Sequence, residues 1–179
     1  MAKKVEEIIV KKTSVFLSRL ENMHLLETVS HFIETHENNF TERSWNCNIR
    51  TSNNMCSNIL YDIDEFEYLT TEIESTIKAY NKKIYGKNIP FCISNSWINI
   101  LGMYGYQEPH IHPNHTGSGI LYLTDNNSEI EFIVYPEDYR KSLKPNKGDI
   151  LLFDSYTYHR VVESKQKRMS LAFNYRIQA

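Results

Sequence analysis

The sequence predicts a mainly β protein: an antiparallel sandwich or barrel formed by its second half, with flanking helices from its first half. Two observations lead to this expectation. From Ser94 onward, apolar and polar residues alternate in short runs separated by turn signals such as "DNNS" and "KPNKGD". Residues 64–85 instead carry apolar side chains at helical spacing. We interpret the 179 residues as one domain, with helical support and edge strands in 1–90 and the β core in 91–179.

The first elements are expected to be a strand and a helix. Residues 7–19 alternate loosely between apolar and polar side chains, which favours a strand. Residues 22–36 favour a helix that begins behind a candidate cap at Asn22. Its apolar positions fall at helical spacing: Leu26, Val29 and Ile33.

Residues 64–85 give the clearest helical signal in the chain. Acidic residues occupy the first turn, Lys82 and Lys83 occupy the last, and Gly86 follows as a stop signal. The apolar residues form one stripe: Phe66, Leu69, Ile73, Ile77, Tyr80 and Ile84. An amphipathic helix of this kind needs a sheet to cover, and the second half of the chain is expected to supply it.

The second half contains six candidate strands with no helical segment between them. Such an order is typical of an antiparallel sandwich or barrel. The expected ranges are 94–101, 118–124, 129–135, 149–153, 159–163 and 168–177.

Composition argues against several classes of function. The formal net charge of −2 disfavours a nucleic-acid partner, and no apolar run is long enough to span a bilayer. The N-terminal stretch is interrupted by charges, so we expect no secretion signal and a cytoplasmic protein. Cys47, Cys56 and Cys92 are odd in number and lack CxxC spacing, which favours reduced thiols over disulfides or a cysteine zinc site. Composition leaves the oligomeric state open.

Three of the seven histidines lie within the stretch "HIHPNH". In an extended segment His110 and His112 point to the same side, so they can share one metal ion. His159, at the start of another predicted strand, can complete a three-residue site for iron, zinc, copper or nickel. The alternative is a pair of histidines on an exposed strand that binds nothing. His115 lies beyond a predicted turn and is expected at the surface or behind the ligands.

The last predicted strand, "RMSLAFNYRI", alternates strictly. Arg168 and Ser170 share a face with Ala172 and Asn174, and the other face is apolar. Alternation alone leaves open whether the polar face points into a barrel or out to water.

Five motifs in order make the chain resemble the iron(II)- and 2-oxoglutarate-dependent oxygenases. They are "HIH", "SGILYL", "GDILLF", "YHRVV" and "RMSLAFNY", within residues 97–177. The earlier segments "KKTSVFLSRLEN" and "SWNCNIRTSNN" also resemble, more weakly, a group of small bacterial and phage members of this family. The resemblance implies a double-stranded β-helix, a jelly-roll barrel with the metal in its mouth and the N-terminal helices packed on its outer face.

The family motif is His-x-Asp/Glu, a distant His, and an Arg or Lys about ten residues later. The resemblance implies iron(II) ligation by His110 and His159, with His112 standing where the carboxylate is expected. A histidine at this position departs from the usual pattern and adds one unit to the net charge of the iron site.

The resemblance also implies a binding site for 2-oxoglutarate as cosubstrate. Arg168 matches the basic residue that pairs with the far carboxylate, Ser170 is its partner, and Tyr122 matches a tyrosine that holds the cosubstrate in some relatives. Asn99 shares a predicted strand face with Trp97 and is either a further cosubstrate contact or a structural residue. The implied reaction hydroxylates a peptide, a protein residue or a small metabolite, and releases succinate and CO2.

Two other functions remain open at this point. A cupin-type metal dioxygenase or isomerase would share the barrel and the His-x-His motif without using 2-oxoglutarate. A non-catalytic metal-binding barrel would keep the histidines alone. The loop expected before the motif contains Tyr104, Tyr106 and Gln107, which are candidates either for the substrate entrance or for ordinary loop packing.

Overall fold

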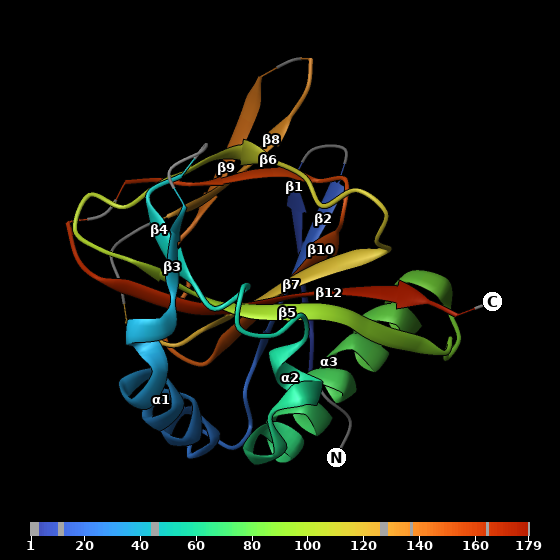
Figure 1. Ribbon diagram of the computed structural model, residues 1–179. Coiled ribbons are helices and arrows are strands. Elements are labelled where there is room, and N and C mark those ends of the chain that lie inside the picture. Colours follow the sequence, from blue (N-terminus) through green and yellow to red (C-terminus); the bar gives the residue numbers. More distant parts are fainter. Residues whose placement is uncertain are drawn as a thin grey trace.

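The larger of two antiparallel sheets forms the centre of the protein (Figure 1). The computed structural model describes residues 4–10, 13–43, 47–125, 129–136, 138–163 and 165–178. The larger sheet has eight strands in the order β1 (Glu6–Val10), β2 (Thr13–Arg19), β10 (Asp149–Asp154), β7 (Gly117–Tyr122), β12 (Arg168–Ile177), β5 (Phe91–Leu101), β4 (Ile49–Thr51) and β3 (Thr41–Arg43).

The smaller sheet faces the inner surface of the larger one. It has four strands in the order β6 (Gln107–His110), β11 (Tyr158–Val161), β8 (Ile130–Val134) and β9 (Tyr139–Leu143). Between the sheets lies an apolar cluster that includes Ile120, Tyr122, Phe132, Leu151 and Phe153. Two facing antiparallel sheets around one such core confirm the expected double-stranded β-helix.

The helices cover the outer face of the larger sheet, on the side of β5 and β12 away from the smaller sheet (Figure 1). They are α1 (Leu25–His36), α2 (Ile59–Asp62) and α3 (Glu67–Tyr85). Ile73 and Ile77 of α3 join Leu171 and Phe173 of β12 in one buried cluster. The apolar face of the last strand therefore packs under the helices, and its polar face points inward. No helix in the described part of the chain is long and apolar enough to cross a membrane.

The helix predicted over 64–85 is confirmed with one refinement at its start. Residues Asp64–Phe66 form a 3-10 turn, and the α-helix begins at Glu67. Gly86 ends it with a φ of 73°, a left-handed conformation that glycine adopts without steric cost.

Two expectations for the N-terminal half were wrong. Residues 7–19 are not one strand, since β1 and β2 pair as a hairpin. The first helix begins at Leu25 without a side-chain cap, and Asn22 instead accepts a hydrogen bond from the His24 backbone N–H at 3.1 Å, in the turn before the helix.

The segment before the metal motif also differs from the expected loop. Residues Gln107–His110 form β6, which pairs with β11 and places His110 directly opposite His159. This strand pairing brings the two halves of the histidine cluster together.

Candidate metal centre and adjoining pockets

The structure brings His110, His112 and His159 together at the mouth of the barrel. Their candidate ligand nitrogens all lie within 4.8 Å of one another. The ring centroids of His110 and His159 are 4.3 Å apart, and that of His112 lies 5.1 Å and 5.2 Å from them. Three imidazoles at these separations can bind one cation with small side-chain adjustments.

Backbone carbonyls orient two of the three rings. The Nδ1 of His110 lies 2.8 Å from the carbonyl oxygen of Glu108, and the Nδ1 of His159 lies 2.9 Å from that of Thr157. A carbonyl only accepts hydrogen bonds, so both Nδ1 atoms carry the proton and both Nε2 atoms keep a lone pair. This is how metal-binding histidines are commonly held.

Burial keeps the cluster neutral. Burial, together with the smaller effects of His110 and His115, lowers the pKa of His112 to about 3. Burial also lowers the pKa of His110 and, to a greater extent, that of His159, which packs 4.7 Å from the ring of Phe153. Unprotonated imidazoles are the form that a metal binds.

A buried inner pocket adjoins the cluster and is lined by His159, Arg168, Ser170 and Asn99 among others. Arg168 is 1% exposed, and its guanidinium carbon lies 4.8 Å from the centre of the Tyr122 ring. Tyr122 packs against Arg168 without lining the pocket itself. Burial raises the pKa of Tyr122, and the positive charge of Arg168 opposes that effect.

The polar side chains of the inner pocket match a carboxylate group, in a space of about 30 Å³. A guanidinium fork and a hydroxyl on one strand face are donors that match carboxylate oxygens. The Oδ1 of Asn99 is buried, and within the described residues no hydrogen bond engages it. A buried polar atom of this kind indicates a polar ligand or water in the pocket.

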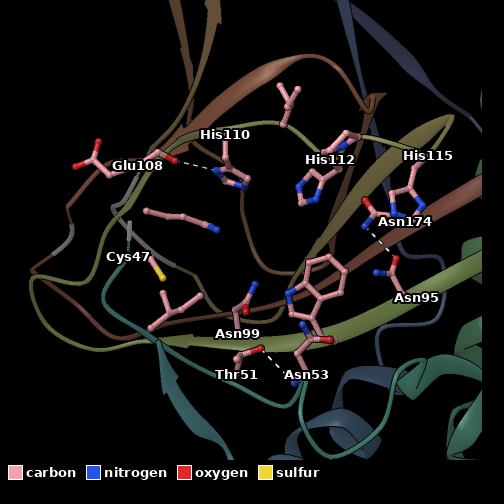
Figure 2. Close-up of a pocket in the computed structure, with 15 residues that line it drawn as sticks. Cys47, Thr51, Asn53, Asn95, Asn99, Glu108, His110, His112, His115 and Asn174 are labelled. Atoms are coloured by element: carbon pink, nitrogen blue, oxygen red, sulfur yellow. Dashed lines mark hydrogen bonds between the residues drawn. The ribbon is translucent and has the colours of Figure 1, made fainter. Parts of the chain in front are cut away.

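A larger outer pocket of about 640 Å³ opens beside the cluster (Figure 2). Its walls come from β4, β5 and the segment around His110 and His112. Trp97 lines this pocket, with its ring centroid 6.0 Å from that of His112. Amide side chains are frequent around it: Asn53, Asn95, Asn99, Gln107 and Asn174. The volume accommodates a small molecule or a few residues of a peptide.

Sequence reasoning found the deep residues more readily than those of the outer pocket. Gln107 lines the outer pocket, but Tyr104 and Tyr106 do not, and they are 53% and 37% exposed. Asn53 and Asn95 were missed because isolated asparagines carry no sequence signal of a pocket. His115 lines the outer pocket, and its Nδ1 is 2.8 Å from the Ser94 hydroxyl.

Comparison with known proteins places this arrangement in a structural class. No protein-family model and no curated protein sequence matches the chain. Among solved structures, a prolyl-4-hydroxylase from Pseudomonas putida aligns over 92% of this chain and 93% of its own, with 12% identity and a TM-score of 0.70. The chain has the fold of this hydroxylase. At this identity, the similarity to such oxygenases establishes the architecture alone.

Two further solved structures share this fold and contain bound molecules. A prolyl hydroxylase from Trichoplax adhaerens, in complex with a hypoxia inducible factor peptide fragment, aligns over 90% of this chain and 82% of its own, with 15% identity and a TM-score of 0.70. The epimerase SnoN, in complex with Fe3+, alpha ketoglutarate and nogalamycin RO, aligns over 89% of this chain and 78% of its own, with 10% identity and a TM-score of 0.68.

Proposed function

We propose that the protein is an iron(II)- and 2-oxoglutarate-dependent dioxygenase that hydroxylates a peptide, a protein residue or a small metabolite. One observation carries the proposal: three imidazole nitrogen atoms meet within 4.8 Å beside a pocket that contains a buried arginine. The three histidines are neutral, so they do not form ion pairs with Arg168. Ion pairing therefore does not explain why the histidines and the arginine lie side by side.

His110, His112 and His159 would hold the iron. Three neutral nitrogen ligands on one side of an ion leave coordination positions open for other molecules. The Glu108 and Thr157 carbonyls fix two of the rings, so little side-chain freedom is lost when the ion binds.

Arg168 and Ser170 would hold the far carboxylate of 2-oxoglutarate. Both side chains belong to β12 and point into the inner pocket, next to His159. Tyr122 supports the guanidinium through its ring, and Asn99 offers a buried amide to the cosubstrate. Direct contact of the Tyr122 hydroxyl with 2-oxoglutarate stays a prediction.

When bound, iron and 2-oxoglutarate would supply, with dioxygen as the oxidant, oxidative decarboxylation to succinate and CO2 coupled to hydroxylation of a substrate C–H bond. The chain positions and shields these groups. Phe132 and Phe153 pack around His159 at ring-centroid distances of 6.1 Å and 4.7 Å and exclude water from that side. The outer pocket is open to a substrate on the other side.

Anaerobic titration tests the proposal. Adding iron(II) and then 2-oxoglutarate should produce a weak visible charge-transfer band that saturates at one equivalent of each. The His159→Ala variant should lose the band, and the His31→Ala variant, altered on the exposed surface of α1, should keep it. Metal binding without the band would support a cupin-type activity instead, and no stoichiometric metal binding would contradict both readings.

A further inference from the structure

A polar network runs from the inner pocket, which Ser118 and Asn174 line, to the wall of the outer pocket, which Asn174, Asn95 and His115 line. Ser118 of β7, Asn174 of β12 and Asn95 of β5 form a row across three adjacent strands, since Ser118 pairs with Asn174 and Asn174 with Asn95. Ser94 and His115 lie beside this row. Figure 2 shows Asn95, Asn174 and His115 grouped at the end of the pocket near His112.

A β-bulge accounts for the position of Ser94. Along β12, Asn174 pairs with Asn95 but Tyr175 pairs with Ile93, so Ser94 is an extra residue in β5. A bulge redirects the side chain of the extra residue, and bulges are common next to binding sites. Here the Ser94 hydroxyl reaches both the His115 ring and the Asn174 backbone.

The Ser94 hydroxyl determines which nitrogen of His115 carries the proton. It donates its hydrogen to the Asn174 carbonyl oxygen at 3.1 Å, so it can only accept from the Nδ1 of His115 at 2.8 Å. The Nε2 of His115 therefore keeps a lone pair and can only accept. Among the described residues, no hydrogen bond engages this nitrogen. Burial lowers the pKa of His115, and the charge of Arg176 acts in the same direction, which favours the neutral ring.

A second set of hydrogen bonds fixes the Asn95 amide. Ser118 donates to the Oδ1 of Asn174 at 2.6 Å, and the Nδ2 of Asn174 donates to the Oδ1 of Asn95 at 3.0 Å. With its oxygen engaged, Asn95 presents its Nδ2, which can only donate. In the described part of the chain, no acceptor is bonded to that Nδ2.

We propose that Asn95 and His115 bind an amide group of the substrate, with Asn95 donating to its carbonyl oxygen and His115 accepting from its N–H. The assignment of these residues to a substrate rests on the proposed function. The amide belongs either to the main chain of a peptide or to a primary carboxamide, and the two share this donor and acceptor chemistry. Asn95 and His115 are the contact residues, and Ser94 is a positioning residue.

The charge of the outer pocket agrees with a neutral amide. Among the described residues that line it, none is Lys or Arg, and the one carboxylate is that of Glu108. A carboxylate ligand could pair with Asn95 but would leave His115 facing a second acceptor. An ester retains the carbonyl oxygen but lacks the N–H, so it also leaves His115 without a partner.

Small probes test the pair without knowledge of the natural substrate. The full chain is titrated with acetamide and with N-acetylglycine N-methylamide, and each probe is compared with an ester analogue that lacks the relevant N–H. The side-chain amide resonance of Asn95 is followed by NMR, with zinc and 2-oxoglutarate present and absent. The loss of one hydrogen bond should weaken the ester about 2- to 12-fold relative to its amide.

Variants identify the groups responsible. The His115→Phe and Ser94→Ala variants should bring the amide-to-ester ratio toward one, while His31→Phe, a matched control on the exposed face of α1, should leave it unchanged. Preference for acetamide alone would assign a carboxamide, and preference for the capped glycine alone would assign a peptide main chain. If neither amide binds the unaltered protein more tightly than its ester analogue, Asn95 and His115 do not bind amides.

The proposal and the proposed function fail separately. If the protein prefers amides over esters but shows no charge-transfer band, the amide site is supported and the oxygenase function is contradicted. If the charge-transfer band forms but the protein shows no preference for amides over esters, the oxygenase function is supported and the amide site is contradicted.

Discussion

Replacing Arg168 with Met gives the most informative perturbation of the cosubstrate site. The guanidinium is buried and lines the inner pocket, so the fork can form two charged hydrogen bonds to a carboxylate. At about 1.5–3 kcal/mol each, their loss corresponds to at least about 100-fold weaker 2-oxoglutarate binding. Iron affinity should change little, because the histidines and their carbonyl partners are untouched. Arg168→Lys keeps the positive charge but loses the two-pronged geometry. Its affinity for 2-oxoglutarate should therefore lie between those of the unaltered protein and Arg168→Met.

The assay is anaerobic calorimetric titration of 2-oxoglutarate into the iron-loaded protein, after circular dichroism has shown that each variant is folded. Arg160→Met is the matched control, because Arg160 neighbours His159 but points outward and pairs with Glu131 at 2.7 Å. Equal losses of iron and 2-oxoglutarate affinity in Arg168→Met, or an effect of the same size in Arg160→Met, would refute the role given to Arg168.

The remaining predictions concern the packing of the larger sheet and are measured as free energies of unfolding in urea. Gly119→Ala should cost about 1–3 kcal/mol, because an added Cβ would overlap an aromatic ring of the core, while Gly102→Ala, with open space around it, should cost about 0.5 kcal/mol or less. Tyr175→Phe removes a buried 3.0 Å hydrogen bond to Asn81 and should cost about 1–3 kcal/mol. Tyr68→Phe, at a position that is 76% exposed, is its control, and an equal cost there would argue against the buried bond.

The last strand was predictable because its apolar and polar side chains alternate, although both of its faces are mostly buried. The last strand occupies Arg168–Ile177, as the alternation predicts. Alternation could not say which face points inward, because a polar face inside a barrel and a polar face in water give the same pattern. The resemblance to the oxygenases favoured the inward reading, and Ser170 is 4% exposed.

The short strands could not be predicted because neighbouring strands specify them more than their own residues do. Strand β6 consists of Gln107–His110 and contains Glu108 and Pro109, which are both depleted in strands. Strand β9, Tyr139–Leu143, is a polar edge strand that pairs with β8 alone. Polar side chains on an edge strand prevent association with other chains but remove the alternation that predicts a strand.

The candidate metal residues were easier to predict than the amide-binding pair. His110 and His112 share a short motif, and the distance to His159 follows the family pattern. Asn95 and His115 acquire their arrangement from the bulge at Ser94, and a single extra residue in a ten- to eleven-residue strand leaves no mark on composition or spacing. Strand register, which the sequence does not encode locally, decides such features.

Iron binding by single histidine variants tests the central claim most directly. The unaltered chain should bind one equivalent of iron(II) under anaerobic conditions. His110→Ala, His112→Ala and His159→Ala should each weaken binding by more than about 100-fold, a larger loss than that typical for residues that only support a ligand. His31→Ala should bind iron like the unaltered chain. If any of the three variants keeps full affinity, the corresponding imidazole is not a ligand and the three-histidine centre is contradicted.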